Sequence, residues 1–214
     1  MSGFENIDIV EIITLIVALT VAIVGHEIAH GWVAFKFGDT TAKSLGRLSI
    51  NPIRHVDPLG TIIVPALLYL STGFVIGWAK PVPVNTYTVI RNGGYMGAIC
   101  VSLAGITYNF ILAALAFGAL KSGFAPALLA QFFFMLMAVN LILGLFNLYP
   151  IPPLDGSKAL EYLLRMLNSQ SAANLLSSSQ RYGMIVLVII VISPIGNQVF
   201  YPIRYILSAF VSAL

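Results

Sequence analysis

Residues 10–35 read VEIITLIVALTVAIVGHEIAHGWVAF, and this stretch decides the class of fold. It is long and apolar enough to cross a bilayer as a helix, which takes about 20 mostly apolar residues. It nevertheless contains the pattern His-Glu-x-x-His at residues 26–30, with two of the chain's three histidines. An ionisable side chain at the centre of a membrane costs about 2.5–3.5 kcal/mol or more, so three of them in one apolar helix need a chemical explanation.

The spacing of these three residues indicates a metal site. On a helix, residues four apart lie on the same face, so His26 and His30 can present their imidazole nitrogens to one ion. This pattern on a helix is typical of zinc. Glu27 lies about 100° around the helix from His26, where it can reach a metal-bound water as a general base.

A catalytic zinc usually takes three protein ligands and keeps one position for water. The sequence leaves four candidates for the third ligand, which are Asp155, Asp57, His55 and Asp39. Asp155 is favoured because it ends the segment NLYPIPPLDG, residues 147–156, in which three prolines prevent a regular helix. The alternative is a helix-ending turn with an exposed aspartate. Asp57 precedes a proline and suits the N-cap of a helix, while His55 is more typical of a structural or interfacial histidine.

The composition places the whole chain in a membrane. Of 214 residues, 58% are hydrophobic and 9% are charged, against roughly 25% charged in soluble domains. Such a chain is too apolar to be disordered. A net charge of +3 without a basic run excludes a nucleic-acid binder. The single cysteine, Cys100, excludes an internal disulfide and is expected to pack within the membrane.

The predicted fold class is an all-α polytopic membrane protein with about five to six hydrophobic helical segments. Prolines and glycines interrupt residues 58–85, and the part GWAKPVPVN at 77–85 cannot be helical. We therefore expect a re-entrant hairpin there, with a short β-like or extended return near the active site. The predicted apolar segments are residues 10–35, 58–79, 95–120, 125–149 and 182–203. The last is interrupted at residues 193–196 and followed by residues 205–214, so this C-terminal part forms either one broken helix or a helical hairpin.

The basic residues support this hairpin. With it, nine of them fall on one side of the membrane, and Lys121 falls on the other with the acidic N-terminus. The positive-inside rule then predicts that the loops after His30 and Asp155 face the cytoplasm. The nine are Lys36, Lys43, Arg47, Arg54, Lys80, Arg91, Lys158, Arg165 and Arg181.

Two smaller elements complete the expected organisation. Residues 41–51 alternate as a strand does, and residues 157–168 have the spacing of a short amphipathic helix at the cytoplasmic interface. We expect one integral membrane domain over residues 1–214, with a core at about 10–156 and accessory C-terminal helices at 157–214. No internal repeat of convincing period is present.

Four motifs, in order along the chain, resemble those of the site-2 proteases, zinc metalloproteases that cut substrate helices within or beside the membrane. The resemblance covers roughly residues 23–161. It implies that His26, His30 and Asp155 hold one zinc ion per chain and that Glu27 is the general base. The motifs are HEIAHG at 26–31, GWAKPVPVN at 77–85, AGITYNF at 104–110 and NLYPIPPLDG at 147–156.

The resemblance also assigns a role to Asn109, which matches a family asparagine that holds substrate or stabilises the oxyanion. The alternative for Asn109 is a hydrogen bond between helices, which is a common use of polar residues in membranes. Ile106 stands where the family usually has a proline. The short connection at residues 121–126 leaves no room for a PDZ domain, and we expect no nucleotide-sensing domain after Leu214, so the chain looks like a compact member.

The expected function is therefore zinc-dependent hydrolysis of transmembrane segments near the cytoplasmic side of a membrane, which for this family form is expected to be a prokaryotic cell membrane. The expected partners are a membrane-spanning substrate and the lipid bilayer, without nucleic acid and with a homo-oligomer left open. The alternatives are a polytopic metal-ion transporter, which the lack of a repeat disfavours, and a catalytically silent membrane binding protein, which the intact Glu27 disfavours.

Overall fold

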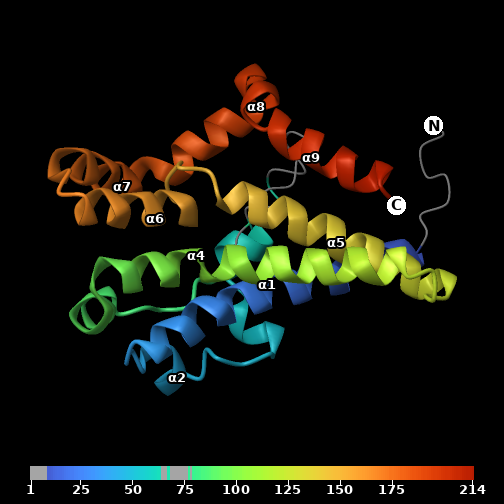
Figure 1. The fold of residues 1–214 in the computed structure, drawn as a ribbon, viewed down its shortest axis with the longest axis horizontal. Helices are drawn as coiled ribbons and strands as arrows, with labels where there is room; N and C mark the ends of the chain where they lie inside the picture. The colour runs from blue at the N-terminus through green and yellow to red at the C-terminus, as the bar shows by residue number, and fades with distance from the viewer. Residues whose placement is uncertain (1–8, 64–66, 68–76, 78) are drawn as a thin grey trace.

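The computed structural model describes residues 9–63, 67, 77 and 79–214. Within these ranges the regular structure is helical and no strand occurs (Figure 1), which confirms the all-α class. The elements are α1 (Ile9–Lys36), α2 (Thr41–Ser44), the 3₁₀-helix η1 (Pro52–His55), the π-helix η2 (Pro58–Ile63), α4 (Thr86–Lys121), α5 (Ala127–Asn147), α6 (Asp155–Met166), α7 (Gln170–Ile192), α8 (Pro194–Val199) and α9 (Tyr201–Ser212).

Four helices, α1, α4, α5 and α7, are long and apolar enough to cross a membrane. The chain is an integral membrane protein on this evidence and on its composition. The described residues contain fewer membrane-spanning helices than the five to six apolar segments expected, because α8 and α9 are too short to span a membrane. Most of the predicted segment at 58–79, and with it the tip of the predicted hairpin, lies outside the described residues.

Helices α1, α4 and α5 form the centre of the molecule, with α4 packed along both of the others (Figure 1). Their contact is made by small residues, such as Ala18 of α1 and Ala116 of α4, against Leu136 and Met137 of α5. Small side chains let helix backbones approach closely, and packing of this kind drives association between helices in lipid. This close approach is what brings polar groups from three helices to one place.

Helix α4 bends at Gly94, whose backbone has φ 61° and ψ −166°. Glycine enters this region readily because it has no Cβ. The predicted span at 95–120 therefore begins at the bend. The preceding turns, from Thr86 onward, belong to the same element and are capped by the Asn85 side chain, which accepts a hydrogen bond from the Thr88 amide.

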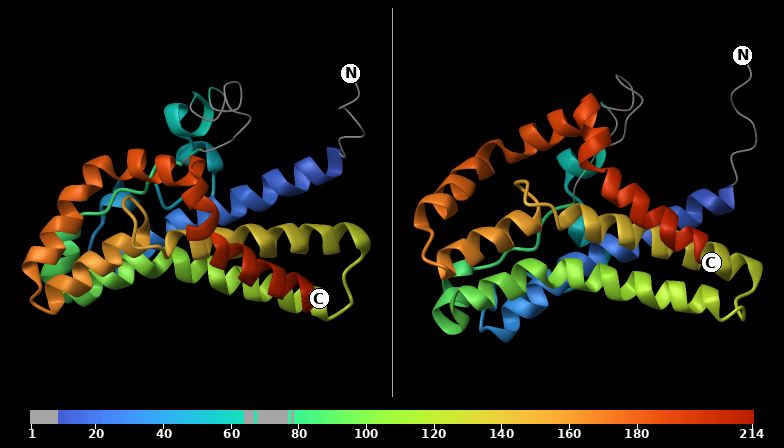
Figure 2. Two further views of the ribbon diagram at one scale, coloured as in Figure 1. Left: turned by 90° about the horizontal axis from the view of Figure 1, so that it is seen from above. Right: turned by 45° about the horizontal axis from the view of Figure 1, so that its top comes forward.

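The C-terminal helices form an arch over α5 and α6. Helix α6 matches the predicted amphipathic helix at 157–168, two residues earlier. Figure 2 shows α7 starting where α6 ends and α9 finishing beside the connection between α4 and α5. There Lys121 Nζ donates to the backbone oxygen of Ala213 at 2.7 Å. Of the two predictions for the tail, the structure therefore agrees with the broken helix.

The predicted strand at 41–51 is wrong. Residues 41–44 form the short helix α2, and the Arg47 amide donates back to the Ala42 oxygen at 2.8 Å. Gly46, with φ 63°, ends this local structure. The apolar alternation was misleading because these backbone groups bond to their own neighbours and no adjacent strand is described.

Candidate metal centre

His26 and His30 lie on the buried face of α1, with 8% and 9% of their surface exposed. Their Nε2 atoms are 3.0 Å apart. Asp155, the first residue of α6, places its Oδ2 atom 3.0 Å from His26 Nε2 and 3.1 Å from His30 Nε2. The structure thus brings together the two histidines and the favoured third candidate, although 125 residues separate His30 from Asp155.

The hydrogen bonds of the two Nδ1 atoms show which ring nitrogens of His26 and His30 carry the proton. His30 Nδ1 lies 2.7 Å from the backbone oxygen of Val101, which can only accept, so Nδ1 carries the proton. His26 Nδ1 lies 2.6 Å from Oδ1 of Asn109 and donates to it in the same way. A neutral ring protonated at Nδ1 has a lone pair at Nε2. Two lone pairs and a carboxylate oxygen therefore meet in one buried place, and such a set can bind a cation.

Zinc fits this donor set. It binds imidazole nitrogen and carboxylate oxygen at about 2.0–2.2 Å, so neighbouring ligands of a tetrahedral ion are about 3.3 Å apart. The three atoms here are separated by 3.0–3.1 Å. Among the described residues, this is the one group of at least three histidine, cysteine, aspartate or glutamate side chains with its ligand atoms so close together.

Two glycines allow the centre to assemble. A Cβ on Gly105 of α4 would lie 2.5 Å from the His26 ring. A Cβ on Gly156 would lie 2.2 Å from the backbone oxygen of Leu148, at the other end of the segment that joins α5 to α6. Both positions therefore need a residue without a side chain, one to admit His26 and the other to place Asp155.

Glu27 is held by the extended segment at residues 79–85, AKPVPVN, which we call the strap. The Val82 amide donates to Glu27 Oε2 at 2.7 Å. The strap is fixed on the same side by Lys80, whose amide donates to His55 O at 2.9 Å and whose oxygen accepts from Arg47 Nη2 at 2.7 Å. The described residues of the strap form no strand, so the predicted β-like element is not confirmed, and the backbone beside Glu27 is irregular.

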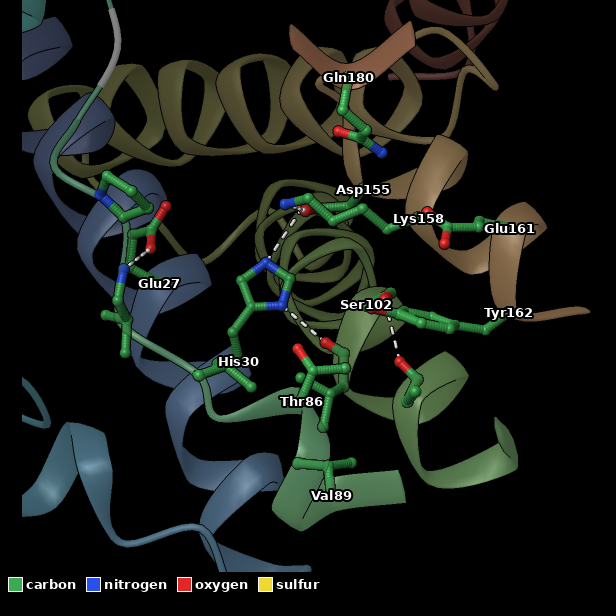
Figure 3. A pocket seen from close by; sticks show the side chains of 15 residues that line it. Glu27, His30, Thr86, Val89, Ser102, Asp155, Lys158, Glu161, Tyr162 and Gln180 are labelled. Atoms are coloured by element: carbon green, nitrogen blue, oxygen red, sulfur yellow. Dashed lines mark hydrogen bonds and ion pairs between the residues drawn. The ribbon is translucent and has the colours of Figure 1, made fainter. Parts of the chain in front are cut away.

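Two cavities meet at the centre, and Glu27, Pro81, Asp155 and Lys158 line both. Figure 3 shows the first, of about 350 Å³, with Glu27 on one wall, His30 in the middle and α6 opposite. Polar side chains line much of it, namely Thr86, Ser102, Glu161, Tyr162 and Gln180. The second, of about 610 Å³, is mainly apolar and is lined by residues such as Ile23, Leu143, Phe146, Leu187 and Val191.

The other three candidate ligands have different partners. Asp39 accepts hydrogen bonds from Thr41 and from the Asn85 amide. His55 Nε2 donates to the backbone oxygen of Ser49 at 2.8 Å. Asp57 caps η2 by accepting from the Leu59 amide, as its place before a proline predicts. None of the three belongs to the group that can hold the ion.

Asn140 was not predicted as a site residue. It is fully buried in α5, and its Oδ1 accepts from Nδ2 of Asn109 at 2.8 Å. A lone asparagine within an apolar span was the available signal, but the sequence does not show which helix it faces.

Comparisons with known proteins identify the family. The model of peptidase family M50 matches residues 120–191, which include Asp155. YwhC of Bacillus subtilis, whose name marks it as a candidate zinc metalloprotease, is 40% identical over 200 residues, which cover 89% of this chain and 84% of YwhC. The chain belongs to peptidase family M50. The resemblance to the site-2 proteases, which form this family, is thereby confirmed.

Two mycobacterial relatives of this M50 peptidase agree. The Rip2 proteins of Mycolicibacterium smegmatis and Mycobacterium tuberculosis, also named as candidate zinc metalloproteases, are 29% and 30% identical. Each match covers 84% of this chain and 67% of the relative. No solved structure matches. The M50 peptidase is therefore a zinc metalloprotease of the membrane, and its metal is zinc.

Proposed function

We propose that this M50 peptidase cleaves membrane-spanning segments of protein substrates, with His26, His30 and Asp155 as zinc ligands and Glu27 as the general base. The observation that carries the proposal is the convergence of three ligand atoms, two of which come with Glu27 from an apolar helix long enough to span a membrane. Two cavities reach this point, one with several polar side chains in its wall and one that is mainly apolar, so water and an apolar peptide can approach the same ion.

Bound zinc supplies a water of lowered pKa, near 7 in well-known enzymes, and polarises the scissile carbonyl. The chain's own residues do the rest. Glu27 accepts the proton of the attacking water as its oxygen bonds to the carbonyl carbon, and then gives that proton to the amine as the C–N bond breaks. The Val82 amide holds one oxygen of the Glu27 carboxylate, which fixes the base in place and leaves other lone pairs for the proton.

The apolar cavity indicates how a substrate is held. Its lining by Ile23, Phe146, Leu187 and similar side chains suits the apolar side chains of a transmembrane segment. A substrate helix has its carbonyls in hydrogen bonds, so it must unwind before it can react. The strap borders this cavity with extended backbone, against which an unwound segment can lie as an added strand.

We further propose that the site opens toward the cytoplasm of a prokaryotic cell. Of the nine basic residues named above, Lys36 ends α1. The other eight lie in the loop after α1, in the strap, in the first turns of α4, or in α6 and α7. Lys121 lies at the opposite end of α4. This asymmetry supports a cytoplasmic location for the end of the molecule that carries α6.

The substitution Glu27→Gln tests the proposal. Glutamine keeps the shape of the side chain and an oxygen for the Val82 amide, but it cannot take a proton. We expect cleavage of a model transmembrane substrate in proteoliposomes to fall by about 10²–10⁴-fold, with zinc still bound one per chain. Full residual activity would overturn the assignment of Glu27, and zinc flux without proteolysis would identify a transporter instead.

A further inference from the structure

Two asparagines are completely buried between the three central helices. Asn109 of α4 and Asn140 of α5 both have 0% of their surface exposed. An amide transferred from water to an apolar setting without hydrogen bonds costs roughly 2–7 kcal/mol. Both side chains therefore need hydrogen-bond partners inside the protein, and these partners define what the two amides do.

The bonds form one chain with a single possible direction. His26 Nδ1 lies 2.6 Å from Asn109 Oδ1. Asn109 Nδ2 donates to Asn140 Oδ1 at 2.8 Å and to the backbone oxygen of Ala22 at 3.3 Å. Asn140 Nδ2 donates to the backbone oxygen of Leu136 at 2.8 Å. The Ala22 and Leu136 carbonyl oxygens can only accept hydrogen bonds. If either amide turned over, its own oxygen would therefore face one of these oxygens.

This arrangement leaves Asn109 nothing with which to touch a substrate. Both hydrogens of its amide are used by Ala22 and Asn140, its oxygen accepts from His26, and no part of it is exposed. A group that stabilises an oxyanion must have a free donor at the reacting atom. The role in holding substrate or oxyanion that the resemblance implies is therefore not the one this geometry supports.

We propose that Asn140 is a positioning residue of the metal centre, acting through Asn109. Asn140 fixes the Asn109 amide so that its oxygen faces His26 Nδ1. This contact keeps the proton on Nδ1, and the lone pair of Nε2 points at the ion. The inference rests on the proposed function in one respect, namely that His26 is a zinc ligand.

The physical consequence is an effect on the metal rather than on folding alone. Partners that orient a ligating histidine typically change metal affinity by 10–100-fold when they are removed. Without Asn140, only the 3.3 Å bond to the Ala22 oxygen still holds the Asn109 NH₂ group, so the amide turns over more readily and then presents its NH₂ group to His26 Nδ1. The ring would have to rotate or change tautomer, and either change spoils the direction of Nε2.

The test measures zinc affinity by competition with a chelator on purified full-length protein, independently of proteolysis. For Asn140→Leu we expect zinc to bind about 10–100-fold more weakly. Asn140→Ala, which adds no bulk, is measured alongside in case the leucine variant does not fold. The control is Thr14→Val, which removes a buried side-chain hydrogen bond to the residue four positions earlier, on α1, and does not touch the centre. Its zinc affinity should equal that of the wild type.

A second arm separates positioning from packing. Asn109→Asp has oxygens on both sides of its carboxyl group, so its orientation no longer matters to His26. In that background Asn140→Ala should weaken zinc binding by less than about threefold, because neighbouring residues that act through one another are not additive. An equal loss in both backgrounds, or lower stability of the metal-free protein with unchanged zinc affinity, would overturn the proposal. Zinc binding without proteolysis in the wild type would refute the proposed function and leave this inference standing.

Discussion

At the scale of the residue, Asp39 shows how a carboxylate outside the metal centre supports it. Its side chain is 2% exposed and joins the end of α1 to the strap. One oxygen accepts from the Thr41 amide at 2.9 Å and from the Thr41 hydroxyl, and the other accepts from the Asn85 amide at 2.6 Å. Burial would raise the pKa of Asp39, but these hydrogen bonds hold it below its usual value.

The lowered pKa gives this contact a predictable pH dependence. A carboxyl group whose pKa is lower in the folded state stabilises that state above its unfolded pKa, and the contribution disappears as the pH falls through the folded pKa. We expect Asp39→Asn to lower the free energy of unfolding by about 1–3 kcal/mol at pH 7. The difference from the wild type should shrink as the pH falls below about 4. Unfolding in detergent at both pH values measures it, and a difference independent of pH would contradict this account.

The residues of the candidate site divide by what the sequence can show. His26, Glu27 and His30 were predictable because helical spacing alone puts two imidazoles on one face. Asp155 was predictable because a proline-rich segment can turn a carboxylate inward. Asn140 was not, because its role depends on which helix it faces.

At the scale of the element, the approach of α4 to α1 depends on Gly105. A Cβ there would lie 2.5 Å from the His26 ring, so Gly105→Ala should displace that ring and weaken zinc binding at least about tenfold. The matched control is Gly118→Ala in the same helix, where no atom lies within 4 Å of the added Cβ. The control should leave zinc binding unchanged. Equal zinc affinity in both variants, measured by chelator competition, would show that α4 can move away from α1 without weakening zinc binding.

The elements themselves were predicted unevenly. The span at 10–35 is α1 to within one residue at each end, because a long apolar run has one stable form in lipid. The strand at 41–51 was wrong because alternation alone does not show whether a partner strand exists. The span predicted at 95–120 begins at the bend of α4 at Gly94, and the helical turns from Thr86 to this bend were not predicted.

At the scale of the whole molecule, the two described ends of the segment at 55–80 lie next to each other. The Lys80 amide donates to the backbone oxygen of His55, and the Asn85 amide donates to Asp39. The chain therefore enters and leaves this segment at one place, beside the end of α1. Helix α4 starts there and Lys121 ends it, so α2 and Lys121 should lie on opposite sides of the membrane.

Two exposed serines test this topology as a matched pair. Ser44 of α2 and Ser122 after α4 each donate a hydrogen bond to the backbone oxygen three residues earlier, and Ser122 also accepts a long one, of 3.5 Å, from the Phe124 amide, so replacement by cysteine is a small change at both. In a Cys100→Ala background, Ser44→Cys should react with a membrane-impermeant maleimide in inverted vesicles but not in intact cells. Ser122→Cys should show the opposite pattern, because the side with most basic residues stays in the cytoplasm. Labelling of both from one side would mean that α4 does not cross, and a reversed pattern would place the metal centre toward the outside.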